Sequence, residues 1–186
     1  NEGSYDLFPG IDRTELADQV LAIKKKYLLN EEFAKVNMRD LLKVLGEKDM
    51  NEFKCETMAS VWLENTGNGH FVTHQLPFEV QFAPVNAILV TDVDGDGNLD
   101  LLLGGNEYQE EIGTGRYDAS YGQLLKNNGK GFFTSILPVK TGFIVDGDVK
   151  SLKQVTTKNN EQLIFASVND NLLRCFKVNN GTPDKK

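Results

Sequence analysis

The sequence predicts a mainly β fold, a partial β-propeller of about two and a half four-stranded blades that follows an N-terminal helical segment. Apolar residues recur at helical spacing only in the first 45 or so residues, and short apolar runs bounded by Gly and Asn begin near residue 59. The stretch 63–71 is repeated at 125–133. We therefore expect a helical segment over 1–50, as an insertion or a cap, and propeller blades over 51–186.

The helical segment is expected to contain three helical stretches. Asp12 is a suitable N-cap, with an acidic residue three positions later. Further stretches are predicted over 31–36 and 38–45, the latter with Asn37 as cap and Gly46 as stop. The apolar residues of the first helix form one stripe, best explained as core: Leu16, Val20, Ile23 and Tyr27.

The repeat defines the strands. Each copy is a strand, a turn with Asn and Gly, and a second strand, and a third, weaker copy lies at 176–181. The period of roughly 50 to 60 residues is about that of one four-stranded propeller blade with its loops. The chain is then expected to hold two strands of one blade (59–65 and 70–76), all of a second (86–137) and three strands of a third (149–178).

The most informative motif is the loop 92–100, which places four aspartates at positions 1, 3, 5 and 9, with Gly at position 6. Crowded carboxylates repel one another, and Ca²⁺ removes this repulsion by taking six to eight oxygen ligands. The loop therefore predicts a calcium site. The expected ligands are the side chains of Asp92, Asp94 and Asp96, the backbone carbonyl of Asn98, and the closing carboxylate of Asp100.

The residues around this loop indicate strands and not the helices of an EF-hand. The runs 87–90 and 101–105 are short and apolar, and position 12 of the loop is Leu103 where an EF-hand has a bidentate Glu. An acidic hairpin turn without an ion is the alternative. The corresponding turn in the third unit, 156–160, has no carboxylate, so the scaffold tolerates the absence of the loop.

Composition excludes several classes of protein. The formal net charge of −7 over 186 residues argues against nucleic-acid binding, which needs a basic surface. No apolar stretch is long enough to span a membrane, and no signal peptide is visible, so we expect a mature chain or a fragment. Cys55 and Cys175 form no metal-binding pattern; they would be either a disulfide or two unpaired packing thiols.

Residues 59–181, and above all the loop 92–100 with the apolar strand and glycines after it, resemble the FG-GAP or VCBS repeat family, the integrin-alpha-like β-propellers. The segments 81–85 and 115–122 are similar to the last repeats of long bacterial surface or periplasmic proteins. The resemblance implies an extracytoplasmic, calcium-stabilised binding platform. Fewer than three blades cannot close a ring, so we expect the remaining blades of a longer chain or an oligomer partner; the alternative is a self-sufficient domain whose helices cover the sheet edges.

No catalytic motif is found, and His70 and His74 are expected to be strand side chains. The expected function is noncatalytic interaction with a protein or glycan, outside the cytoplasm at the cell surface, in the periplasm or as a secreted protein. The connection 106–120 is expected to contact the partner or to pack between blades. Alternatives are a lectin-like sugar binder, or part of a calcium-dependent carbohydrate-active enzyme such as a polysaccharide lyase, in which Arg116 would act.

Overall fold

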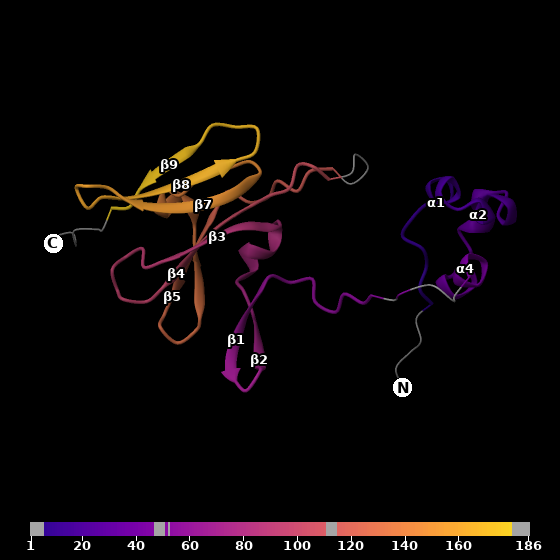
Figure 1. Ribbon diagram of the computed structural model, residues 1–186, viewed down its shortest axis with the longest axis horizontal. Coiled ribbons are helices and arrows are strands. Elements are labelled where there is room, and N and C mark those ends of the chain that lie inside the picture. Colours follow the sequence, from indigo (N-terminus) through magenta and orange to yellow (C-terminus); the bar gives the residue numbers. More distant parts are fainter. Residues whose placement is uncertain (1–5, 47–50, 52, 111–114, 180–186) are drawn as a thin grey trace. The chain divides into compact units, whose positions relative to one another are not determined.

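The computed structural model describes residues 6–46, 51, 53–110 and 115–179. The chain separates into two compact units, Asn1–Glu56 and Thr57–Lys186. The first unit is helical and the second consists mainly of antiparallel strands (Figure 1). The protein is therefore mainly β, as the sequence predicts. The boundary predicted after residue 50 falls outside the described residues and stays a prediction.

The described residues of the first unit form four short helices: α1 (Arg13–Gln19), α2 (Leu21–Lys26), α3 (Asn30–Phe33) and α4 (Met38–Leu45). Helix α1 begins at Asp12, whose Oδ1 accepts a hydrogen bond of 2.9 Å from the backbone of Glu15. Helix α4 begins at Asn37, whose Oδ1 accepts from the Asp40 backbone at 2.9 Å, and it ends at Gly46 with a φ of +86°. These hydrogen bonds confirm the capping predictions. Short polar side chains at these positions satisfy the first N–H groups of a helix.

The helical unit differs from the prediction in two places. The expected first helix is interrupted at Val20, which is extended with φ −130° and ψ 101°. The stretch expected over 31–36 is helical only as far as Phe33. With the helix broken at Val20, apolar side chains of both halves pack into one small core. Tertiary packing here outweighs the continuous helical pattern of the sequence. The buried core residues are Ala17, Ile23, Phe33, Val36 and Leu41.

The part of the second unit that the structure describes contains three antiparallel sheets. The first sheet pairs β1 (Val61–Gly67) with β2 (His70–Gln75). The second sheet contains, in spatial order, β3 (Val85–Thr91), β4 (Asp100–Gly105), β5 (Gln123–Asn127) and β6 (Phe133–Ile136). The third sheet contains, in spatial order, β7 (Val149–Thr156), β8 (Gln162–Val168) and β9 (Arg174–Lys177). Two short helical segments, η2 (Phe78–Phe82) and α5 (Pro138–Thr141), follow β2 and β6. The strands lie close to the predicted positions.

The sequence repeat corresponds to two hairpins with the same turn. Asn65 accepts a hydrogen bond of 2.9 Å from the Gly67 N–H between β1 and β2, and Asn127 accepts one of 3.0 Å from the Gly129 N–H between β5 and β6. The second glycine of each turn has a positive φ, +77° and +78°. Asn side chains that accept from the backbone two residues later stabilise such turns, so the two copies fold alike.

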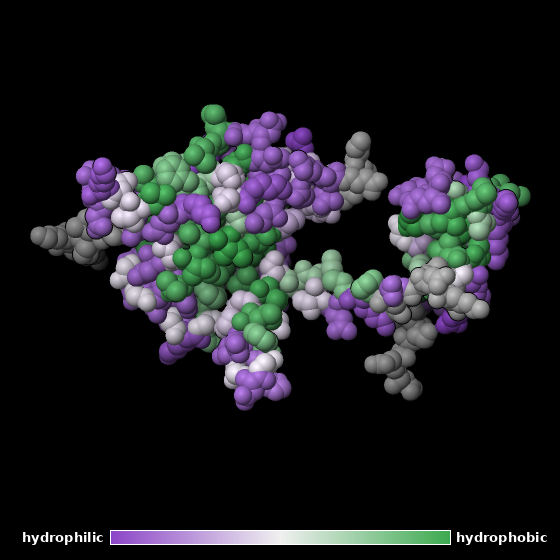
Figure 2. All heavy atoms as spheres, in the orientation of Figure 1, coloured by the Kyte–Doolittle hydropathy of each residue, from purple (hydrophilic) through white to green (hydrophobic). Residues whose placement is uncertain are grey.

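The second and third sheets pack face to face. Gly104 of β4 lies against Val149 of β7, and a Cβ atom at position 104 would be 2.5 Å from Val149 Cγ1. Apolar side chains also gather on the surface over the second sheet (Figure 2). The core between the two sheets comprises Ala87, Leu102, Phe143, Val145, Val149, Leu152, Ile164, Ala166 and Val168. A smaller core beside η2 comprises Val80, Leu103 and Leu125.

Candidate metal centre

The aspartate loop joins β3 to β4, and three of its carboxylates converge. Asp92, Asp94 and Asp100 each offer an oxygen, and these oxygens all lie within 4.8 Å of one another. Oxygens on opposite sides of a Ca²⁺ ion would be about 4.6 to 5.2 Å apart, and adjacent ligands would be closer. The three carboxylates are therefore spaced as ligands of one cation could be.

The loop is folded by its own carboxylates. The two oxygens of Asp92 accept hydrogen bonds from the backbones of Gly95, at 2.8 Å, and Gly97, at 2.9 Å. Both glycines have a positive φ, +79° and +85°, a backbone conformation that residues with a side chain rarely adopt. Asp94 Oδ1 accepts from the Asp96 backbone at 3.2 Å. Backbone donors thus hold the anionic side chains inside the turn.

Asp100 is the buried member of the group, with 1% of its surface exposed. Its Oδ2 accepts from the Val93 backbone at 3.1 Å, and its Oδ1 accepts from the Asn127 backbone at 2.9 Å. The Asn127 side chain in turn donates to the Leu99 carbonyl at 3.1 Å. A buried carboxylate is costly unless it is hydrogen-bonded and its charge is balanced. Asp100 therefore ties the loop to β5 and favours a cation beside it.

Asp96 is not a member of this group of three carboxylates, and Asn98 is predicted to contribute a backbone carbonyl and not a side chain. Asp96 Oδ1 accepts from the Asn98 backbone at 2.8 Å, and this hydrogen bond, together with the Lys126 ammonium, holds the pKa of Asp96 below its ordinary value. The Asn98 side chain lies so close to Gly129 that a Cβ there would be 2.5 Å from Asn98 Oδ1. Their predicted roles, a side-chain ligand at Asp96 and a carbonyl ligand at Asn98, stay predictions.

Lys126 is a basic residue in this acidic site. Its Nζ forms an ion pair with Asp94 Oδ2 and lies 3.5 Å from Asp96 Oδ2, and the hydrogen bond to Asp94 is the largest cause that raises the pKa of Lys126. Sequence reasoning missed both Lys126 and Asn127. A signal existed for Asn127, because it occupies the place of Asn65 in the repeat.

The chain matches no protein-family model, no curated protein and no solved structure. The likeness to FG-GAP or VCBS repeats thus stays a prediction, and the functional argument rests on the geometry. Within the described residues, no helix combines the length and the apolar character needed to cross a membrane.

The connection 106–120 is anchored at its base. The buried side chain of Asn106 donates to the carbonyls of Ser120, at 2.8 Å, and Gly147, at 3.0 Å, and accepts from the Ser120 backbone at 2.9 Å. Glu107 pairs with Lys150 of β7 at 2.9 Å. These contacts bind the base of the connection to the third sheet, while residues 111–114 lie outside the described ranges.

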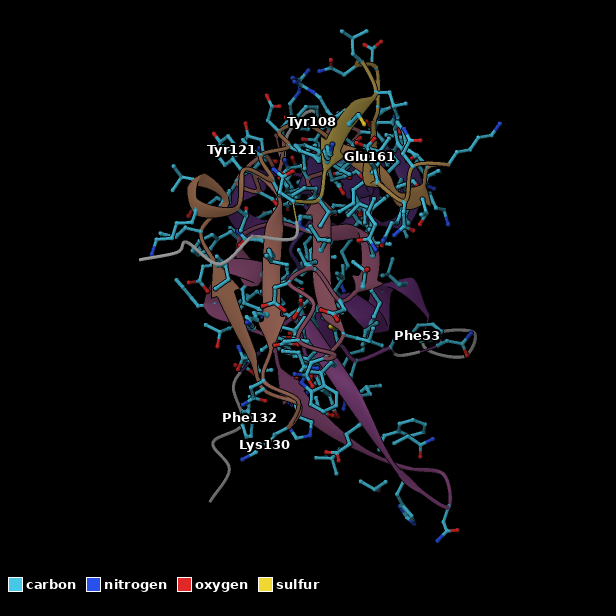
Figure 3. All side chains as sticks on the ribbon, turned by 90° about the vertical axis from the view of Figure 1, so that its left-hand side faces the viewer. Phe53, Tyr108, Tyr121, Lys130, Phe132 and Glu161 are labelled. Carbon is cyan, nitrogen blue, oxygen red and sulfur yellow. The ribbon has the colours of Figure 1, made fainter. Side chains whose placement is uncertain are left out.

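The two ends of the second unit carry different side chains. Lys130 and Phe132 lie at the tip of the β5–β6 hairpin, at the opposite end of the unit from Tyr108 and Tyr121 (Figure 3). Because Asn98 contacts Gly129 in the same hairpin, the aspartate loop lies beside this tip. Arg116 lies 4.8 Å from the centre of the Tyr108 ring.

The histidines and cysteines show no catalytic arrangement among the described residues. His70 and His74 both lie in β2, as predicted for strand side chains. His74 stacks on Trp62 with ring centres 4.3 Å apart, and its Nε2 is 2.9 Å from Glu64 Oε2. Cys55 and Cys175 are both exposed, which differs from the packing role expected of thiols that form no disulfide.

Proposed function

We propose that this chain is a noncatalytic, calcium-stabilised segment of a β-propeller that serves protein or glycan interaction outside the cytoplasm. The observation that carries the proposal is the convergence of Asp92, Asp94 and the buried Asp100. Three carboxylates within 4.8 Å of one another repel, and the backbone donors and the Lys126 ammonium around them offset this repulsion only in part, so a bound cation would be favourable.

Asp92, Asp94 and Asp100 would hold the ion, and it would add positive charge to a group of three carboxylates that the single Lys126 ammonium balances only in part. The role of the chain's own residues is to fix the loop: Asp92 orders its glycines, and Asp100 connects it to Asn127 and hence to the β5–β6 hairpin. Stabilisation of the loop would therefore extend to the whole second sheet.

The extracytoplasmic location is proposed from the chemistry of such a site. Calcium modules of extracellular proteins bind with dissociation constants of about 10⁻⁴ to 10⁻³ M. A site with three converging carboxylates and a competing Lys126 fits this weak range. The concentrations needed to fill it are found outside cells.

The arrangement of strands supports the propeller. The second sheet is a four-stranded antiparallel meander, the first sheet has the same hairpin turn as β5–β6, and the third packs on the second through β3, β4 and β7. Four-stranded sheets packed face to face are the units of propellers. The remaining blades of a longer chain, or an oligomer partner, would complete the ring.

The alternative as a polysaccharide lyase has no specific observation in its favour. The Arg116 guanidinium lies over the Tyr108 ring, 4.8 Å from its centre. This contact joins two parts of the connection 106–120 and is a structural role for Arg116. The enzyme and lectin alternatives stay predictions, which turnover or binding on a panel of glycans would test.

The deciding experiment is calorimetric titration of chelator-treated chain with Ca²⁺, paired with melting curves. We expect one site and a rise in melting temperature, because an ion that binds only the folded state stabilises it. Asp92→Asn and Asp94→Asn should abolish both signals, while Asp96→Asn should weaken them less, because its carboxylate lies outside the group of three. A parent chain that shows neither heat nor a shift would contradict the proposal.

A further inference from the structure

We propose that the face of the second sheet bearing Ile88 and Val90, together with the open edge of β1, is a docking surface for a β-hairpin from polypeptide outside residues 1–186, an inference that rests on the proposed propeller segment. Two independent features lead to this inference. Among the described strands, β1 pairs with β2 alone, so its other edge offers backbone N–H and C=O groups. The adjoining face of the second sheet exposes large apolar side chains.

Strand β3 has an apolar residue on each of its two faces. Ala87 and Leu89 belong to the core shared with the third sheet. Ile88 and Val90, the alternate residues, therefore point to the opposite face, and they are 61% and 52% exposed. The two side chains are neighbours on this face and form one apolar patch, and contiguous exposed apolar surface is typical of interaction sites.

Burial on this face changes abruptly between neighbouring strands. Leu103 of β4 pairs directly with Ile88 in the register, yet only 3% of Leu103 is exposed. Leu103 is covered because it shares a core with Val80 and Leu125. The side chains of β4 and β5 on this face are therefore covered, whereas those of β3 are not. Apolar surface remains visible over the second sheet (Figure 2).

The cover on the outer part of this face comes in part from the β1–β2 hairpin. Trp62 of β1 packs against Phe133 of β6 with ring centres 6.1 Å apart, and the same indole would lie 3.1 Å from a Cβ at Gly131. The first sheet therefore lies over the outer strand of the second sheet. In the proposed complex, strands added at the open edge of β1 extend the first sheet across Ile88 and Val90.

The opposite face shows what kind of occupant fits. There the strand pair β7–β8 covers β3 and β4, with Val149 seated on Gly104. An equivalent occupant is two antiparallel strands of about five to eight residues, apolar at alternate positions. One strand would hydrogen-bond to β1, and its apolar side chains would pack on Ile88 and Val90. Strand addition of this kind satisfies a sheet edge through main-chain bonds.

The test uses the whole chain and a phage-displayed library of 20-residue β-hairpins. We expect selected hairpins to carry apolar residues at alternate positions and to bind Ile88→Lys/Val90→Lys at least about tenfold more weakly than the parent. The matched control is Leu172→Lys/Leu173→Lys, because these residues are 79% and 61% exposed in the β8–β9 turn. Control and parent should bind equally, and a bound hairpin should slow hydrogen exchange at β1 amides.

Several outcomes would overturn the proposal. Selection that yields no binder, or binders that tolerate the Ile88→Lys/Val90→Lys variant, would show that this face does not take a strand pair. Parent chain that self-associates in sedimentation velocity through Ile88 and Val90 would identify a second copy as the occupant. Hairpin binding should persist in Asp94→Asn, so failure of the calcium site and failure of the docking surface are distinguishable.

Discussion

Asp100 has two tasks at the start of β4, because it accepts two backbone hydrogen bonds and also faces the other carboxylates. Asp100→Ala should lower the free energy of unfolding by about 1 to 3 kcal/mol even in chelator, since it leaves two partly buried backbone donors without their acceptor. Asp94→Asn should change stability much less in chelator than in Ca²⁺, because the amide oxygen can still accept from the Asp96 backbone and only the exposed ion pair with Lys126 is lost. Urea unfolding in both conditions measures this, and Asp100→Ala with parental stability in chelator would contradict the assignment.

Lys126 places an ammonium where a metal ion would be attracted. Its ion pair with Asp94 engages a proposed ligand and adds a positive charge next to the site. Lys126→Met should therefore tighten Ca²⁺ binding by roughly threefold to tenfold, a modest effect because the side chain is partly exposed and screened. Calorimetry checks this, with Lys130→Met on the exposed hairpin tip as control; unchanged or weaker binding in Lys126→Met would show that the ammonium does not compete.

Glu107 gives a pH prediction away from the metal centre. The Gln109 N–H and the Lys150 ammonium hold the pKa of Glu107 below its ordinary 4.5. Its contribution to stability is thus present above about pH 4.5 and is lost as the pH falls through the lowered pKa. The melting temperatures of parent and Glu107→Gln should differ most above pH 4.5 and converge in more acidic buffer. A constant difference across this range would refute the ion pair's role.

At the scale of elements, two equivalent turns are closed by different chemistry. The β3–β4 loop is held by carboxylates that accept backbone hydrogen bonds, whereas in the β7–β8 turn the Thr157 N–H donates to the Glu161 carbonyl at 2.8 Å. The second turn needs no counter-charge. The β7–β8 connection closes without aspartates, so closing a turn between paired strands does not by itself explain the four aspartates of the β3–β4 loop.

The contact between the second and third sheets depends on a glycine. Gly104→Ala should cost about 1 to 3 kcal/mol, since the new methyl group would lie 2.5 Å from Val149 Cγ1. Gly10→Ala is the control, because a Cβ there meets nothing within 4 Å. Combining Gly104→Ala with Val149→Ala should cost less than the sum of the two single changes, which urea unfolding measures as a coupling energy. Strict additivity would indicate that the sheets adjust elsewhere.

At the scale of the whole molecule, the two units have separate cores, so we expect calcium to stabilise only the strand unit. Trp62, the single tryptophan, lies in β1 and reports on that unit by fluorescence. Its thermal midpoint should rise in Ca²⁺, while the helical circular dichroism signal of the small first unit should melt at the same temperature with and without the ion. Parallel shifts of both signals would show that the units unfold together.

Local patterns predicted much of this fold. Asn and Gly at hairpin turns, Asn37 and Gly46 at helix ends, and the aspartate loop between two apolar runs each depend on interactions within a few residues. The interruption at Val20 could not be predicted in this way, since it depends on the packing of α1 and α2 against one core.

The sequence by itself determined the classes of element, the strand grouping and the position of the acidic loop, because backbone geometry and charge repulsion act at short range. Only the tertiary structure decided which carboxylates converge and which do not, how Lys126 and Asn127 reach the loop, and where Ile88 and Val90 remain exposed. These depend on how distant strands pair and how sheets pack, which no local pattern contains.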